Sequence, residues 1–177
     1  MRSRYAIRES EAAHFVTATI VQWMPVMSSA ACCDVIVRSF LHCREHKGLK
    51  IHAWVILDHH FHAIFSGPEL MKTIRDLKRF TARELLGQLK IEGRDWLLNQ
   101  LAFYCAAHKC SSEHQVWQEG VHPQAIEGDE MMRQKLDYLH GNPVKRGWVA
   151  APEHWRYSSA HEWLPGGSPL FRCDLWQ

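Results

Sequence analysis

Two short apolar segments stand almost end to end near the middle of the chain. The first spans residues 49–57 and the second residues 60–65, and only Asp58 and His59 separate them. A connection this short lets two strands pair only as an antiparallel hairpin. Gly67-Pro68 closes the second strand. We therefore expect a β-hairpin at the centre of the fold.

The second strand of this hairpin begins with His60-Phe61-His62. Side chains two residues apart on a strand point to the same face, so both imidazoles share one face while Phe61 enters the core. Neutral imidazole is a common metal ligand, and this spacing is usual for two ligands. The pair could equally be two satisfied polar residues on a solvated sheet face. The alternation excludes His59 from the face of His62.

Capping residues and periodicity predict the other elements. We expect a strand at 14–21, a helix from a cap at Ser28 or Ser29 to about His46 with Gly48 as its stop, a helix at 69–89, a segment at 96–110 that is either a strand or a buried helical turn, a short strand near 125–126, and a helix that opens at Gly128 or Asp129 and ends before Pro143. The order β-α-β-β-α-β is that of a split βαβ, or ferredoxin-like, sandwich. We predict an α+β fold with a mostly antiparallel sheet, helices on one face, and an added C-terminal helix.

Length and composition indicate one domain, with a core at about 14–150 and a loop-like tail at 151–177. The chain has 177 residues, of which 46% are hydrophobic, and no apolar stretch approaches the roughly 20 residues of a membrane span. The N-terminal residues lack the apolar segment of a signal peptide, so we expect a cytoplasmic protein without membrane contact. Six cysteines form no Cys-x-x-Cys pair, which favours free thiols over a structural zinc site: Cys32, Cys33, Cys43, Cys105, Cys110 and Cys173.

Tyr138 lies off the apolar face of the last predicted helix. At about 100° per residue, Met132 and Leu139 fall on one face, and Tyr138 lies roughly 120° away on the side of Asn142. It is either a tyrosine packed at the helix margin or a nucleophile. A free phenol has a pKa of about 10, so a nucleophilic tyrosine needs a base or a cation nearby. A metal on the adjacent sheet face would draw charge from a phosphate under attack.

Asn142 is a candidate third metal ligand. Its neutral amide oxygen suits a hard cation. Two histidines, one amide oxygen and open positions suit Mg²⁺ or Mn²⁺ bound together with a substrate phosphate, whereas a closed zinc site would need four protein ligands. The alternative is turn chemistry, because Asn-Pro is a frequent helix exit.

Basic residues gather in two places, although the net charge of the chain is only +2. Residues 69–90 hold six basic and three acidic side chains, and Lys145-Arg146 follows the tyrosine helix. A solvated helix face is the usual explanation. The other is contact with nucleic-acid phosphates, and Trp148 or Trp155 could stack on unpaired bases rather than pack in the core. The candidate DNA-binding residues are Lys72, Arg75, Lys78, Arg79, Arg83, Lys145 and Arg146.

These motifs, in this order, resemble the single-tyrosine HUH transposases, and most closely the REP-associated tyrosine transposases of bacteria. The resemblance runs from about His14 to Ser159 and includes Tyr-x-x-x-Asn-Pro-Val-Lys-Arg-Gly-Trp-Val and Trp-Arg-Tyr-Ser-Ser. Its most specific parts are residues 54–64, 116–126 and 137–149. The family usually has Pro-Asn before the histidine pair, where this chain has Asp58-His59. That carboxylate could join the metal or reshape the turn.

The resemblance implies a metal-dependent DNA transposase or endonuclease. Tyr138 would attack a phosphodiester of single-stranded DNA, form a 5′-phosphotyrosine and release a 3′-hydroxyl. His60, His62 and Asn142 would bind Mg²⁺ or Mn²⁺. The partner would be single-stranded or hairpin DNA with a repetitive extragenic palindromic (REP) sequence, and the protein a monomer or a homodimer. Two alternatives stay open: a hairpin-binding module without catalysis, and a metal-dependent hydrolase without a covalent intermediate.

Overall fold

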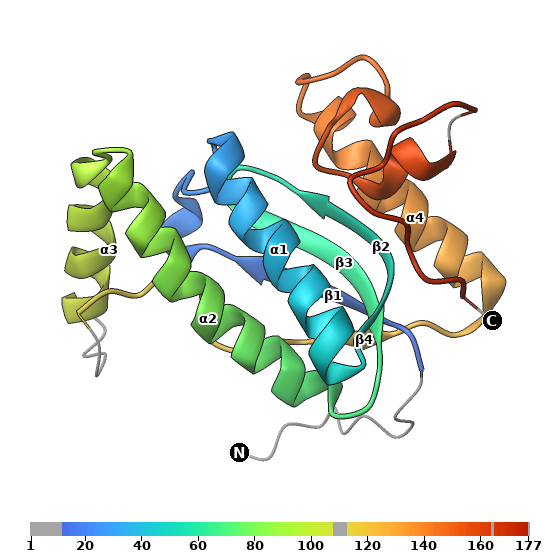
Figure 1. Cartoon of the computed structure of the whole chain (residues 1–177), viewed down its shortest axis with the longest axis horizontal. Coiled ribbons are helices and arrows are strands. Elements are labelled where there is room, and N and C mark those ends of the chain that lie inside the picture. Colours follow the sequence, from blue (N-terminus) through green and yellow to red (C-terminus); the bar gives the residue numbers. More distant parts are fainter. Residues whose placement is uncertain (1–11, 108–112, 164, 177) are drawn as a thin grey trace.

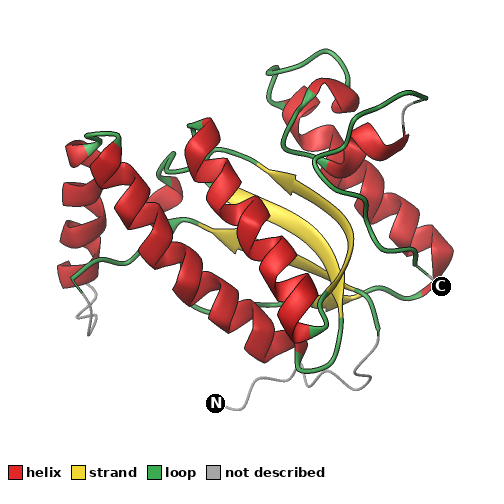
Figure 2. Ribbon diagram, in the orientation of Figure 1, coloured by secondary structure: helices red, strands yellow, loops and turns green. Residues whose placement is uncertain are grey.

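The computed structural model describes residues 12–107, 113–163 and 165–176. Figure 1 shows four strands between two helical layers, and Figure 2 shows the same view by secondary structure. The elements are β1 (His14–Thr19), α1 (Ala30–Lys47), β2 (Lys50–Ile56), β3 (His60–Ser66), α2 (Leu70–Ile91), α3 (Asp95–Ala107), β4 (Gln124–Ala125) and α4 (Gly128–Lys145), with short 3-10 helices η1 (Val21–Trp23), η2 (Pro152–His154) and η3 (Ser159–Trp163).

The four strands form one sheet in the order β2-β3-β1-β4, and all neighbours are antiparallel. The order along the chain is β-α-β-β-α-α-β-α, so the predicted ferredoxin-like sandwich is confirmed with one helix, α3, added. The predicted hairpin is also confirmed: β2 pairs with β3, and the amide of Leu57 donates to the carbonyl of His60 at 2.9 Å.

The two faces of the sheet are covered by different helices (Figure 1). On one face Val16, Trp54 and Phe61 pack in a large apolar core with residues of α1 and α2. On the other, Val55 and Ile64 pack in a smaller core with residues of α4. Alternation along each strand therefore sends every second side chain toward α4.

The ends of α1 follow the predicted capping chemistry. The side chain of Ser29 accepts a hydrogen bond from the amide of Cys32 at 3.2 Å, and Gly48 ends the helix in the left-handed conformation with φ of 64°. Serine satisfies a free amide of the first turn, and glycine adopts positive φ without steric cost. These two residues fix where the chain turns from α1 into β2.

The structure corrects one predicted helix end and decides between the two alternatives for residues 96–110. The tyrosine helix was predicted to end before Pro143, but α4 continues to Lys145. Proline removes the backbone donor that would bond to the carbonyl of Leu139, yet the helix continues past it, and the amide of Trp148 donates to the carbonyl of Pro143 at 3.0 Å. Within 96–110, the described part is helical, so the strand alternative fails.

The C-terminal tail covers the outer edge of β2. The amide of Ile56 donates to the carbonyl of Tyr157 at 2.8 Å, and the amide of Asp174 donates to the carbonyl of Ile51 at 2.7 Å. The Asp174 carboxylate also accepts from the Ile51 amide and pairs with Arg44, each at 2.8 Å. An edge strand otherwise exposes unpaired backbone groups. The predicted loop-like tail is thus irregular but docked.

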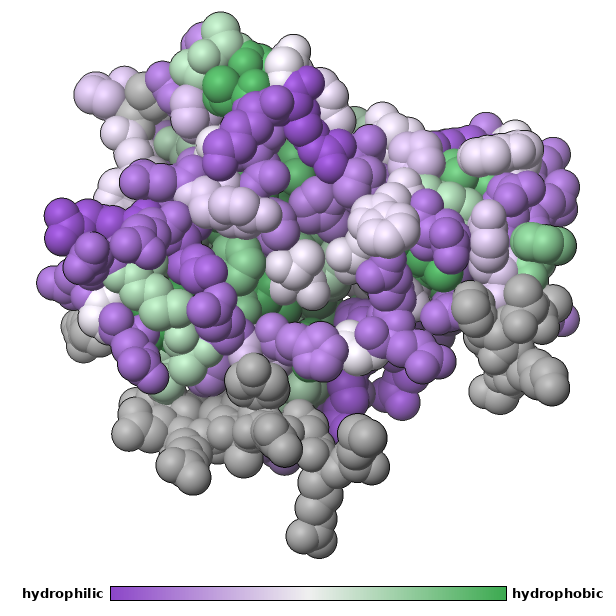
Figure 3. Space-filling view, turned by 180° about the vertical axis from the view of Figure 1, so that it is seen from behind, coloured by the Kyte–Doolittle hydropathy of each residue, from purple (hydrophilic) through white to green (hydrophobic). Residues whose placement is uncertain are grey.

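Four described cysteines are free thiols, as predicted: Cys32, Cys33, Cys43 and Cys173. Cys110 lies outside the described residues, as does the N-terminal segment on which the absence of a signal peptide was predicted. In the part of the chain that the structure describes, no group of three or more His, Cys, Asp and Glu side chains could hold a metal ion. No described helix has the length and apolar content needed to cross a bilayer. Figure 3 shows one face of the molecule, on which hydrophilic side chains predominate and hydrophobic ones form small patches.

Two glycines offer a matched test of this backbone. Gly67 has φ of 145°, and a Cβ there would lie 2.6 Å from the carbonyl oxygen of Gly48, whereas a Cβ on Gly87 in α2 would meet nothing within 4 Å. We predict that Gly67→Ala lowers the free energy of unfolding by about 1–3 kcal/mol. Gly87→Ala should raise it by about 0.5–1 kcal/mol, because alanine favours the helix. Urea unfolding of both variants measures this, and a change of the same sign in both would contradict it.

Candidate active site

His60 and His62 lie side by side on the face of β3 that α4 covers. Their Nε2 atoms are 3.1 Å apart, and the two residues are only 9% and 5% exposed. Phe61 between them is fully buried against the core of α1 and α2. The structure therefore brings the predicted pair together as strand alternation requires.

Both imidazoles are neutral at physiological pH. Burial, with a smaller contribution from neighbouring positive charge, lowers the pKa of His60 to about 3 and that of His62 to about 4. A neutral imidazole keeps one nitrogen lone pair, which is what a metal ion requires. The imidazoles of His60 and His62 therefore carry no positive charge that would repel a cation.

Thr17 orients the His62 ring from the neighbouring strand. It stands opposite His62 in the β1–β3 register, and its Oγ1 is hydrogen-bonded to Nδ1 of His62 at 2.8 Å. Such a bond fixes the ring orientation and occupies Nδ1, so Nε2 is the nitrogen that would bind a metal. Thr17 could not be predicted from the sequence, because only the strand register reveals it.

Tyr138 stands beside this pair. Its ring centroid is 5.3 Å from that of His62, with 64° between the planes, and its edge also meets Phe15 at 5.9 Å. Tyr138 is 45% exposed, whereas Leu139, the next residue of α4, is fully buried. The predicted position off the apolar helix face is confirmed, so a substrate can reach the phenol.

Two lysines of α4 surround the tyrosine. Nζ of Lys145 lies 5.2 Å from the ring centroid of Tyr138, and Nζ of Lys135 lies 4.8 Å from that of Phe15, which itself stacks on His62. Lys145 therefore places a positive charge beside the ring of Tyr138. Lys135 was missed by the sequence analysis, although its place three residues before Tyr138 puts both on the same helix face.

Asn142 lies one helical turn after Tyr138. Its side-chain nitrogen donates to the carbonyl of Tyr138 at 2.7 Å. This bond uses the amide nitrogen and leaves the amide oxygen available to a cation. Its role as a metal ligand stays a prediction.

The residues present fit a divalent metal ion with open positions. Two nitrogens about 2.1 Å from an ion and at about 90° to each other are separated by about 3 Å, which matches the Nε2 atoms of His60 and His62. No third His, Cys, Asp or Glu joins them among the described residues, so the remaining positions would go to amide, water or phosphate oxygens. Oxygen-rich open sites are typical of Mg²⁺ and related ions, not of structural zinc.

The sequence is similar to two bacterial proteins. It is 27% identical to the REP-associated tyrosine transposase of Escherichia coli (strain K12) over 128 residues, covering 72% of this chain and 64% of that protein. It is 28% identical to a Haemophilus influenzae protein named for the same family over 117 residues, covering 66% and 62%. The chain thus spans just under two thirds of each relative. No model of a known protein family matches it.

The fold matches a solved structure described as a REP-associated tyrosine transposase bound to a REP hairpin. The TM-score is 0.62 at 18% sequence identity, over 100% of this chain and 99% of the other. The resemblance to the REP-associated tyrosine transposases is confirmed.

The side chain of Arg146 binds the Asp58-His59 turn, which stands where the REP-associated tyrosine transposases usually have Pro-Asn. The Arg146 guanidinium donates to Oδ1 of Asp58 at 2.9 Å and to Nε2 of His59 at 2.6 Å. Arg146 caps the C-terminus of α4, so these three residues, the Arg146 latch, tie the tyrosine helix to the hairpin. The carboxylate is paired with Arg146, which favours a reshaped turn over a metal ligand.

The Arg146 latch also determines which ring nitrogens of His59 and His60 carry a proton. A guanidinium only donates, and burial lowers the pKa of His59, so neutral His59 accepts at Nε2 and carries its proton on Nδ1. That proton points at Nδ1 of His60, 2.9 Å away. A metal on Nε2 of His60 would leave a proton on Nδ1 there too, so this contact must open when a metal binds.

The basic residues predicted on α2 lie across the sheet from Tyr138, and most have partners. Lys72, Arg79 and Arg83 each pair with a carboxylate, and Arg75 is exposed. Lys78 is mostly buried; burial lowers its pKa, and its Nζ donates to the carbonyls of Gln118 and Gly120 at 2.7 and 2.8 Å. It therefore ties α2 to the segment before β4. The structure brings Lys145 to the tyrosine and Arg146 to the histidine hairpin, but it does not bring the residues of α2 to either.

The buried histidine pair predicts a loss of stability in acid. Unfolded histidine binds a proton below a pH of about 6.5, whereas the folded pair does so only near the lowered pKa values of about 3 and 4. The unfolded state then binds more protons, so the unfolding free energy falls as pH drops from about 6.5 toward 4. At about pH 5 each histidine should cost roughly 2 kcal/mol relative to neutral pH. Urea unfolding in a chelator measures this, and a His60→Gln variant with an unchanged pH slope would contradict it.

The His59–His60 contact predicts a gain of metal affinity when His59 is replaced. In His59→Asn no ring proton faces Nδ1 of His60, so one hydrogen bond that opposes binding is lost. We expect the Kd for Mn²⁺ to fall about 2- to 10-fold in isothermal titration calorimetry. His154→Asn, at an exposed histidine of η2, is the control. Unchanged or weaker Mn²⁺ binding by His59→Asn would contradict the prediction that the His59–His60 contact opposes metal binding.

Proposed function

We propose that this protein is a metal-dependent transposase or endonuclease that nicks and rejoins single-stranded DNA through a 5′-phosphotyrosine on Tyr138. The observation that carries the proposal is the accessible Tyr138 ring 5.3 Å from the His62 ring, beside a buried pair of neutral histidines. The similarity to the REP-associated tyrosine transposases supports it.

The reaction needs only one nucleophile from the chain. The phenol oxygen of Tyr138 attacks phosphorus, a bond from that oxygen to phosphorus forms, and the bond from phosphorus to the 3′-oxygen breaks. The phenol proton is lost to solvent, and the departing 3′-oxygen takes up a proton. Rejoining is the reverse, with a 3′-hydroxyl as nucleophile and the phenol as leaving group. The reaction needs no nucleotide cofactor as an energy source, because one phosphoester bond forms for each one that breaks.

The residues around Tyr138 supply positive charge to the phosphate. Lys145 lies over the tyrosine ring, where its ammonium attracts a phosphodiester. Lys135 extends the same positive field toward His62. Mg²⁺ or Mn²⁺, held by His60, His62 and Asn142, would neutralise charge that develops on the phosphate oxygens.

The substrate in this proposal is single-stranded DNA next to a hairpin of REP-like sequence. The fold neighbour described as bound to a REP hairpin supports a hairpin partner. The Arg146 latch joins the tyrosine helix to the histidine hairpin of the same chain, so the chain provides both halves of its own site. A monomer is then sufficient for cleavage, and a homodimer would contain two complete sites.

A second candidate function is a hairpin-binding module without catalysis. The observation that favours it is the His59–His60 contact, which must open before a metal can bind. Such a module would bind hairpin DNA with strong salt dependence and form no covalent adduct.

A denaturing gel with a labelled, hairpin-bearing single strand and Mn²⁺ separates these functions. The native chain should form a protein–DNA adduct, and Tyr138→Phe should lose it while it still binds the hairpin. His60→Ala should lose metal-dependent cleavage because one of two nitrogen ligands is gone. Tyr104→Phe, at a tyrosine of α3, is the matched control and should keep the adduct.

Three other outcomes would contradict the proposed function. An adduct in Tyr138→Phe would refute the assigned nucleophile. Cleavage without an adduct would favour a hydrolase, and binding without cleavage would favour the module.

A further inference from the structure

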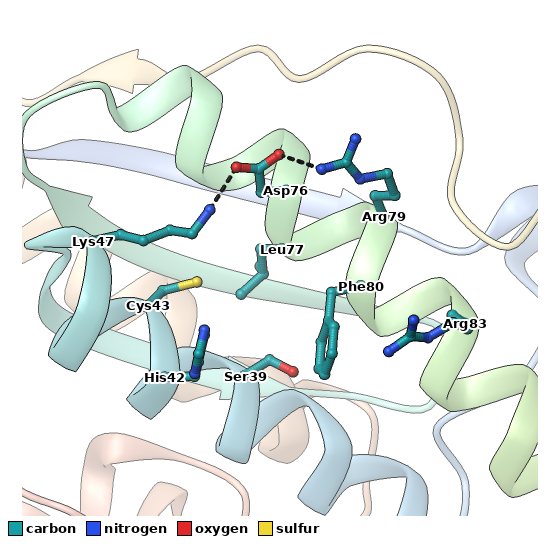
Figure 4. A pocket seen from close by; sticks show the side chains of 9 residues that line it. All are labelled: Ser39, His42, Cys43, Lys47, Asp76, Leu77, Arg79, Phe80 and Arg83. Carbon is teal, nitrogen blue, oxygen red and sulfur yellow. Dashed lines mark hydrogen bonds and ion pairs between the residues drawn. The ribbon is translucent and has the colours of Figure 1, made fainter.

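A cavity of about 460 Å³ opens between α1 and α2, on the side of the sheet away from Tyr138 (Figure 4). Its floor includes Cys43 and Leu77, and its walls include the rings of His42 and Phe80. Phe80 is 46% exposed, so its ring is accessible from the cavity. Nothing in the proposed cleavage reaction uses this cavity.

The two rings form a slot of suitable width for a flat ring. His42 and Phe80 are nearly parallel, with 15° between their planes, and their centroids are 6.4 Å apart. Figure 4 shows both rings nearly edge-on, with the side chain of Ser39 drawn between their lower ends. Successive stacked bases lie about 3.4 Å apart, so a base between two rings needs about 6.8 Å. A shift of a few tenths of an ångström in two surface side chains would admit one.

Positive charge surrounds the slot. Arg83 lies over the far side of the Phe80 ring, with its guanidinium carbon 5.4 Å from the centroid. Lys47 and Arg79 share a single carboxylate, Asp76, at 2.5 and 3.0 Å. Arg79 and Arg83 have side chains 84% and 76% exposed, so their ion pairs exchange readily with another anion. Even with the Arg83 pair to Glu84 included, three cations meet two carboxylates.

We infer that this slot is a second DNA-binding site, which takes one unpaired nucleotide with its base between His42 and Phe80 and its phosphate against Arg79 and Arg83. Only an unpaired base can insert, since a paired base is already stacked and hydrogen-bonded within the duplex. Stacking on aromatic rings with nearby arginines is how proteins bind single strands without reading sequence. The inference rests on the proposed function only in that DNA is the ligand.

The test measures binding in a Tyr138→Phe background, so it does not depend on cleavage. The probe is a short thymidine oligonucleotide with one central 2-aminopurine, whose fluorescence falls when its base stacks. The background protein should bind it with quenching. Phe80→Ala should weaken binding about 5- to 150-fold, the loss of one stacked base, and remove the quenching. Phe80→Trp should restore both, which a merely structural role would not explain.

Two controls define the site. Phe103→Ala removes a more exposed phenylalanine from α3, 62% exposed against 46% for Phe80, and should leave binding unchanged. Arg83→Gln should weaken binding and reduce its salt dependence by about one ion, as expected for one phosphate contact. Unchanged binding and quenching in Phe80→Ala would overturn the inference. So would thymidine monophosphate that binds as tightly as the oligonucleotide, because the slot would then serve free nucleotides.

Discussion

The antiparallel pairing of β1 with β3 is the constraint on which the candidate active site depends. It places Thr17 opposite His62 and Thr19 opposite His60, with Phe61 on the other face. Because side chains alternate, a slip of one residue would bury both histidines against α1 and α2 and turn Phe61 toward Tyr138. The buried aromatic contacts of Phe61 with Phe40 and Trp117 oppose such a slip. The packing that stabilises the core therefore also keeps the imidazoles of His60 and His62 on the face of the sheet that α4 covers.

The sheet separates the candidate active site from the proposed nucleotide slot. On one face, α4 presents Tyr138 and Lys145 to the histidine pair, and the Arg146 latch fixes the end of this helix to the hairpin. On the other, α1 and α2 form the slot between His42 and Phe80. Chemistry and capture of an unpaired base would then be carried by different helices and could be altered independently by mutation.

Local signals in the sequence were sufficient for much of this architecture. The two-residue turn at Asp58-His59, the cap at Ser29 and the stop at Gly48 each act through neighbouring backbone, so they predicted the hairpin and α1 correctly. Alternation alone put His60 and His62 on one face. Features that depend on contacts between distant segments could not be predicted: Thr17 requires the strand register, and the partners of Arg146 require the docking of α4. Pro143 did not mark the end of α4, because the loss of one hydrogen bond is outweighed where the helix packs on the sheet.

The central claim is that His60 and His62 hold a divalent metal beside Tyr138. Anomalous diffraction from a crystal of the protein soaked in Mn²⁺ tests it most directly, because manganese can be located without assuming its ligands. The account predicts one strong anomalous peak within bonding distance of both Nε2 atoms, with the His59–His60 contact opened. Manganese found only at other sites, with the two histidines still bonded to each other, would contradict it.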